Sequence, residues 1–160
     1  MAHTGYIPLL VALSIVIAVF ASYAALDLGA RVRRPDADAR WAWGAGAAVA
    51  MGGGIWSMHF VGMLAFEIGM PTAYHLGLTL LSLLLAVAAT GGAFAWVGRV
   101  GAVERDILVS GPLMGLGIAG MHYTGMAALE VPGHLAYSAP VVVVSVLIAV
   151  TAATAALWLT

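Results

Sequence analysis

The chain has 160 residues, of which 63% are hydrophobic and 8% are charged, and its mean hydropathy is +1.05. A soluble domain carries about 25% charged residues, so this composition excludes an ordinary soluble protein and indicates a protein of the lipid bilayer. The net charge of −1 gives no reason to expect a nucleic-acid partner. The absence of cysteine excludes disulfides, thiolate metal sites and thiol chemistry together.

Five long apolar segments follow one another along the chain. They cover residues 7–28, 41–66, 74–97, 107–129 and 138–159. Each is long enough for a helix to cross the hydrocarbon core, which takes about 20 residues. Because backbone groups in lipid must be hydrogen-bonded within their own segment, helices are expected throughout. The predicted fold class is an all-α membrane protein, a bundle of five transmembrane helices. The first segment is long and no Lys or Arg precedes it, so we expect no cleaved leader.

The six arginines predict the orientation of this bundle. Four follow the first helix (Arg31, Arg33, Arg34 and Arg40), and two follow the third (Arg99 and Arg105). Cytoplasmic loops carry the excess of positive charge, so these loops are expected inside, with the N-terminus outside and the C-terminus cytoplasmic. All five histidines then fall in the outer half of the helices or in the outer loops.

The chain also repeats itself. The stretch "MGGGIWSMHFVGMLAFE" from Met51 matches "MGLGIAGMHYTGMAALE" from Met114 at an offset of 63 residues. We interpret the chain as two and a half two-helix units: residues 6–67, 74–130 and, as a half unit, 137–160. Two helices return the chain to its starting side, so the units are parallel about an axis along the membrane normal. His59 and His122 should therefore lie at one depth and face a shared centre.

Each histidine is accompanied by methionines. His59 and Met63 are four residues apart and share one helix face, and His122 and Met126 repeat that spacing. Two further methionines, Met58 and Met121, lie about 100° round the helix from the adjacent histidine, at the flank of that face, where they could be metal ligands in the site of a neighbouring helix. Imidazole and thioether together suit Cu(I), whereas zinc more typically recruits Cys or carboxylates. A cuprous centre with an open position could bind O₂, CO or NO.

Four further residues are expected to surround this metal site. Tyr123 is predicted to be a hydrogen-bonding partner to a ligand or gas rather than a ligand, since the first copy has Phe60 in its place. Glu67 and Glu130 lie about 12 Å beyond their histidines along the helix, at the outer interface. Solvation is their expected role, with attraction of an entering cation as the lesser one. The many glycines let membrane helices approach closely.

The motif Met-His-Tyr-x-Gly-Met, intact at 121–126 and with Phe60 for Tyr in the first copy, resembles that of the bacterial MHYT integral-membrane sensor domain. The resemblance covers nearly the whole chain. It implies a multi-pass domain of the bacterial cytoplasmic membrane that senses O₂, CO or NO through copper. It also implies fusion to cytoplasmic modules of cyclic-di-GMP metabolism or to histidine kinases, which are absent from this chain. Members usually carry three motifs. A third histidine would fall near position 185, so we expect a fragment or a short member, and a homodimer is one way to complete the bundle.

Several alternatives stay open at this stage. His59 and His122 could be the axial ligands of a haem in a redox or sensor protein, or the chain could handle copper for other proteins. A transporter or channel would need polar residues at several depths, whereas the inner halves of these helices are almost purely apolar. No Walker loop, nucleophile elbow or pair of carboxylates is present, so we do not expect an enzyme.

Overall fold

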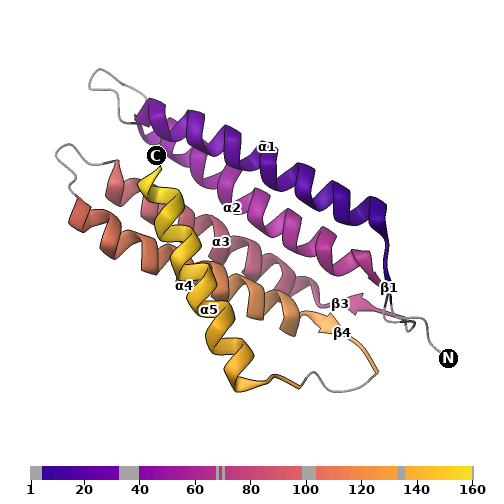
Figure 1. Cartoon of the computed structure of the whole chain (residues 1–160). Helices are drawn as coiled ribbons and strands as arrows, with labels where there is room; N and C mark the ends of the chain where they lie inside the picture. The colour runs from indigo at the N-terminus through magenta and orange to yellow at the C-terminus, as the bar shows by residue number, and fades with distance from the viewer. Residues whose placement is uncertain are drawn as a thin grey trace.

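The computed structural model describes residues 5–32, 40–67, 69, 71–98, 104–132 and 136–159. Within these residues the chain forms five α-helices (Figure 1). They are α1 (Pro8–Val32), α2 (Arg40–Ala65), α3 (Leu76–Val97), α4 (Glu104–Ala127) and α5 (Ala139–Trp158). Their bounds fall within a few residues of the apolar segments, so the sequence predicted every helix.

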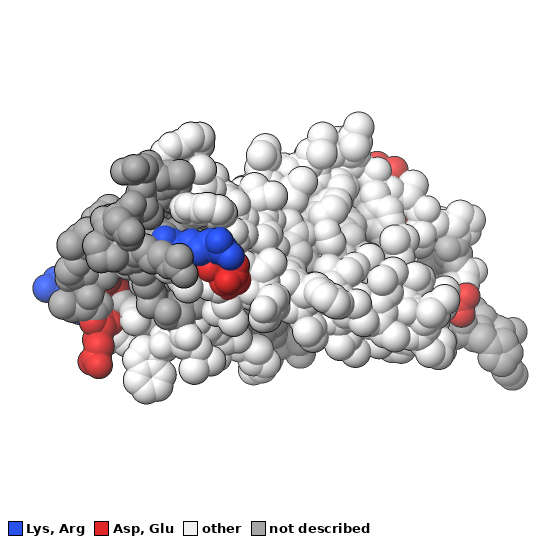
Figure 2. Space-filling view, turned by 90° about the horizontal axis from the view of Figure 1, so that it is seen from above, with Lys and Arg blue, Asp and Glu red and all other residues white. Residues whose placement is uncertain are grey.

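Four of the described helices, α1, α2, α3 and α5, are long and apolar enough to cross a membrane. Helix α4 is less apolar because Glu104 and Asp106 lie in its first turn and because it contains Pro112, His122 and several glycines. On the face seen in Figure 2, charged residues gather at the two ends of the molecule and leave an uncharged belt between them. The structure is therefore that of a helical membrane domain, while the crossing by α4 stays a prediction.

Each helix packs mainly against the helices before and after it in the chain, and α2 also touches α4. The helices lie side by side, with α5 crossing α4 obliquely (Figure 1). All five contribute to a common apolar core, which includes Ala25, Ala47, Met51, Phe94, Met114 and Leu157. We call the end of the molecule that holds the start of α1 the strand end. The opposite end, where α1 leads into α2 and α3 into α4, is the loop end.

Two short strand pairs lie at the strand end, and the all-α prediction missed them. β1 (Gly5–Tyr6) pairs with β2 (Phe66–Glu67), and β3 (Ala73–Tyr74) pairs with β4 (Leu129–Glu130), both antiparallel. One further backbone bond extends each pair: Ile7 N–H donates to Ala65 O, and His75 N–H donates to Ala128 O, both at 2.8 Å. These bonds satisfy backbone groups that helix ends leave free. The strand pairs thus join the start of α1 to the end of α2, and the start of α3 to the end of α4.

Two glycines let neighbouring helix backbones come into contact. A Cβ atom at Gly52 of α2 would lie 2.7 Å from the Val87 backbone of α3, and one at Gly115 of α4 would overlap the Val150 backbone of α5. The positions are related by the 63-residue offset, so both motif helices press on the following helix in the same way. A second glycine of each motif similarly lies against an alanine of the preceding helix: Gly54 on Ala21, and Gly117 on Ala89.

This packing gives a prediction with a matched control one residue away. Gly52→Ala should lower the free energy of unfolding by about 1–3 kcal/mol, because the methyl group would force α2 away from α3. Gly53→Ala should be neutral or stabilising by up to about 1 kcal/mol, because nothing lies within 4 Å of a Cβ there. Thermal unfolding of the two variants in one detergent compares them. Equal losses would contradict close packing at Gly52.

Candidate metal centre

Two histidines from different helices meet inside the bundle. His59 on α2 and His122 on α4 place their Nδ1 atoms 3.4 Å apart. The imidazole rings lie edge to face, with centroids 4.8 Å apart and an interplanar angle of 66°. The repeat predicted that these residues would face a shared centre, and the structure brings their rings into contact; their equal depth in the membrane stays a prediction. Which ring donates the shared proton depends on the tautomers.

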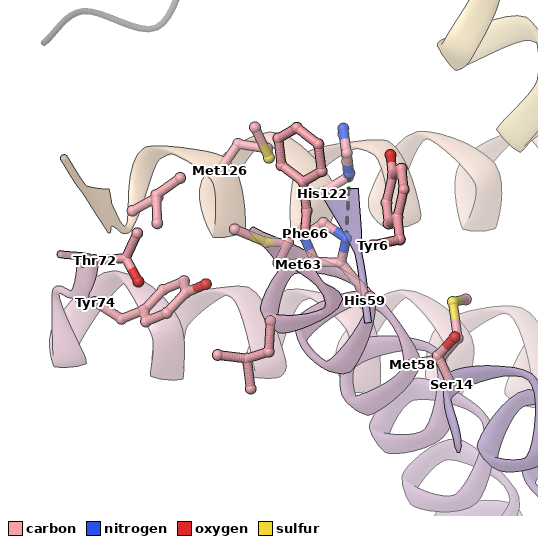
Figure 3. Close-up of a pocket in the computed structure, with 13 residues that line it drawn as sticks. Tyr6, Ser14, Met58, His59, Met63, Phe66, Thr72, Tyr74, His122 and Met126 are labelled. Atoms are coloured by element: carbon pink, nitrogen blue, oxygen red, sulfur yellow. Dashed lines mark hydrogen bonds between the residues drawn. The ribbon is translucent and has the colours of Figure 1, made fainter. Parts of the chain in front are cut away.

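The pair borders a pocket of ≈450 Å³ near the strand end (Figure 3). Met58, Met63 and Met126 line this pocket together with both histidines. In Figure 3, Met63 and Met126 lie on one side of the histidine pair, while Met58 lies apart from it beside Ser14. The structure therefore gathers two imidazoles and three thioethers around one space.

Met121 takes a different position from the other methionines of the motifs. Its side chain is buried at 1% exposure. It lines a smaller cavity of ≈250 Å³, which also borders His59, His122 and Met58. Met121 thus lies beside the histidine pair but does not line the larger pocket.

Phe60 and Tyr123 pack the edges of their rings against the preceding histidine. The centroid distance is 5.4 Å for His59 and Phe60 and 4.9 Å for His122 and Tyr123. The Tyr123 hydroxyl lies 2.6 Å from Ser145 Oγ on α5. Tyr123 therefore bonds to a neighbouring helix, and its predicted bond to a ligand or gas stays a prediction.

The carboxylates expected near the site lie at its edge. Glu67 and Glu130 are exposed on β2 and β4, and neither lines the pocket. His75 caps α3, where its Nδ1 accepts a hydrogen bond from Leu78 N–H at 3.3 Å. His3 and His134 lie outside the described residues.

The donor set of this site suits a soft metal ion. Imidazole nitrogens bind metals at about 2.0–2.1 Å, so two of them on one tetrahedral ion lie about 3.3 Å apart, close to the observed Nδ1–Nδ1 separation. The Nε2 atom of His59 is buried and has no hydrogen-bond partner among the described residues. Those residues include no group of three or more His, Cys, Asp or Glu side chains able to hold a metal, so any such site here depends on the thioethers.

The sequence did not predict several residues that line the pocket. Tyr6, Ser14, Phe66, Thr72 and Tyr74 complete its wall. For two of them the sequence did contain a signal, because Tyr6 and Tyr74 stand at equivalent positions just before the first helix of each unit. Burial raises the pKa of Tyr74 above its ordinary value, so the hydroxyl stays neutral and able to donate a hydrogen bond at physiological pH.

The fold and the site together define a helical membrane domain with paired histidine–methionine motifs. The chain belongs to the MHYT family, whose model, described as a bacterial signalling protein N terminal repeat, matches residues 1–42, 52–110 and 115–160. No solved structure matches the chain.

Curated relatives are much longer proteins. The chain is 48% identical over 156 residues to the bifunctional diguanylate cyclase/cyclic di-GMP phosphodiesterase MucR of Pseudomonas aeruginosa, covering 98% of this chain and 23% of that protein. It is 42% identical to the cyclic di-GMP phosphodiesterase NbdA of the same organism, covering 95% of this chain and 19% of the relative. The signaling protein YkoW of Bacillus subtilis is 36% identical, with coverage of 94% and 19%. The chain thus spans about a fifth of the length of these relatives.

A glycine of the second motif lies against the imidazole of the first motif. A Cβ atom at Gly125 would lie 2.9 Å from His59 Nε2, whereas nothing lies within 4 Å of a Cβ at the equivalent Gly62. Gly125→Ala should therefore push the His59 ring away from His122, and Gly62→Ala should not. Imidazole ¹⁵N chemical shifts in lipid report the change. Unchanged shifts in Gly125→Ala would contradict the contact.

Proposed function

We propose that this chain is a membrane-embedded sensory domain that binds Cu(I) in its histidine–methionine pocket. The observation that carries the proposal is the pair of imidazoles with Nδ1 atoms 3.4 Å apart, next to a pocket lined by thioethers from both motifs. His59, His122, Met63 and Met126 are the proposed ligands, and Met58 lies further from the pair. Soft neutral donors without carboxylates favour Cu(I) over harder ions.

The proposed signal is a diatomic gas, O₂, CO or NO. Cuprous copper with an open position supplies an electron-rich binding site for such a molecule. The pocket of ≈450 Å³ has room for a small ligand beside the donors, and its wall is mainly apolar. Tyr74 and Tyr6 are polar groups of that wall, and Glu67 and Glu130 at its edge would attract a cation from outside.

The proposed output is cytoplasmic signalling. Two relatives are named for cyclic di-GMP synthesis or breakdown, and this chain aligns with about a fifth of each. We therefore infer that the chain is an input domain rather than an enzyme. It would lie in the bacterial inner membrane with the strand end outside and the loop end, where Arg31 and Arg105 lie, inside. An output module of the cyclic di-GMP or kinase type would be its partner, and homodimerisation would bring two such modules together.

The alternative of a haem between the two histidines has less support. Axial ligands must stand on opposite faces of the porphyrin, with the macrocycle between them. The two imidazoles instead pack directly against each other with centroids 4.8 Å apart, which leaves no room for that plane. A role in handling copper for other proteins would use the same ligands, and the relatives' names favour signalling.

Substitution of the proposed ligands tests copper binding. His59→Ala or His122→Ala should abolish stoichiometric Cu(I) binding, because each removes an anchoring imidazole. Met63→Leu or Met126→Leu should weaken it roughly tenfold, about 1.4 kcal/mol, at nearly constant side-chain volume. Competition with a chromogenic Cu(I) chelator under reducing conditions measures the affinity.

Met114→Leu is the matched control, because Met114 is buried in α4 but does not line the pocket. Its copper affinity should equal that of the parent chain. Copper retained by the double histidine variant, or an intense Soret band in the purified protein, would overturn the proposal and, in the second case, favour haem.

A further inference from the structure

Three serines occupy equivalent positions on the odd-numbered helices and use their protons in the same way. Ser14, Ser82 and Ser145 each donate to the carbonyl oxygen three residues earlier, at 2.8, 2.7 and 2.8 Å. A hydroxyl has one proton and two lone pairs. With the proton committed to its own helix, each serine can only accept a hydrogen bond from a neighbouring helix.

The preceding motif helix supplies that hydrogen bond in both complete units. Trp56 Nε1 on α2 donates to Ser82 Oγ at 2.9 Å and also approaches Thr79 O at 3.3 Å. In the second unit the Tyr123 hydroxyl lies 2.6 Å from Ser145 Oγ. Because Ser145 donates to Val142 O, Tyr123 is the donor here.

The two donors occupy different positions of the repeat. The 63-residue offset pairs Trp56 with Ala119, and Phe60 with Tyr123. Positions 56 and 60 are one helical turn apart on the same face. Each unit therefore has a single hydrogen-bond donor among these two positions: the indole of Trp56 in the first unit and the phenol of Tyr123 in the second.

The rings at positions 60 and 123 nevertheless pack alike. The ring centroids of Phe60 and Tyr74 are 5.7 Å apart, and those of Tyr123 and Tyr137 are 5.8 Å apart, in both cases edge to face. Each ring also contacts the imidazole that precedes it in sequence. Fixing this aromatic layer against the next helix consequently fixes the histidine. In the first unit Trp56 acts through Phe60, since their ring centroids are 4.7 Å apart.

We infer that Trp56 and Tyr123 are equivalent positioning residues: each hydrogen-bonds the serine of the following helix and so holds the histidine of its motif against the other. The aromatic–serine bond is named here the serine latch. The tyrosine of the second motif then serves to place His122, and the first motif dispenses with it because Trp56 does the same task. The inference rests on the proposed function only for its metal readout.

Removal of each hydrogen-bond donor, with an aromatic ring kept at the position, tests the latch. Trp56→Phe and Tyr123→Phe should each change the imidazole ¹⁵N shifts of the histidine pair in metal-free protein in lipid. Each should also weaken binding of Ag(I), a redox-stable substitute for Cu(I), by about threefold to tenfold, the range of one interhelical hydrogen bond in a membrane. Tyr23→Phe on α1, whose side chain is 73% exposed, removes a hydroxyl elsewhere and should leave both measurements unchanged.

Transfer of the donor between positions distinguishes a latch from general packing. Phe60→Tyr added to Trp56→Phe gives the first unit the donor of the second, and should restore the parent shifts and Ag(I) affinity. Ser145→Ala should add nothing to the effect of Tyr123→Phe, because the two changes remove the same bond.

The outcomes separate this inference from the proposed function. The protein could bind neither Ag(I) nor Cu(I) and still show imidazole ¹⁵N shifts that Trp56→Phe changes and added Phe60→Tyr restores. That result would support the latch and overturn the copper site. Parent shifts and affinity in both Trp56→Phe and Tyr123→Phe would overturn the latch. Failure of Phe60→Tyr to restore the shifts while the protein keeps its thermal stability would overturn the equivalence of the two donors.

Discussion

The close approach of neighbouring helix backbones is the constraint on which the packing of this domain and its histidine pair depend. Lipid gives helices no hydrophobic reason to associate, so close van der Waals contact has to hold them together. The glycines at 52 and 115 supply that contact with the following helix, and those at 54 and 117 supply it with the preceding one. Helices α2 and α4 are thus each held from two sides. Their mutual contact is slight, and the histidine pair spans it.

Polar groups in an apolar interior are stable only where partners meet them. Most of them find a hydrogen-bond partner within a helix or on a neighbouring one. Serine hydroxyls donate to carbonyl groups, an indole and a phenol donate to serines, and the two imidazoles bond to each other. His59 Nε2 is the exception among the buried side-chain atoms of the described residues. A buried nitrogen that folding leaves without a partner, on a ring that lines a pocket together with thioethers, is a starting point for a ligand hypothesis.

The sequence predicted the helices and the facing histidines because both follow from periodicity. Apolar length defines a membrane helix, and two copies of one motif related by a parallel repeat must present His59 and His122 alike. The strand pairs escaped prediction because two residues carry no pattern, and their partners lie about 60 residues away in the chain. The bond from Tyr123 to Ser145 escaped because it depends on which neighbour the ring reaches, which needs the packing of α4 on α5. Orientation, metal and gas stay predictions, since no contact within the chain depends on them.

The strand pairs have a mechanical consequence for signalling. They join the start of α1 to the end of α2, and the start of α3 to the end of α4, at the strand end. The end of α2 at Ala65 is thereby fixed against the start of α1, through the β1–β2 pair and the bond from Ile7 N–H to Ala65 O. His59 lies about 9 Å from the end of α2 at Ala65, whereas the Arg40 end lies about 37 Å from it, at 1.5 Å per residue. A tilt of α2 about its Ala65 end would therefore displace the Arg40 end about four times as far as it displaces His59, so the domain would act as a lever with the histidine pair on its short arm.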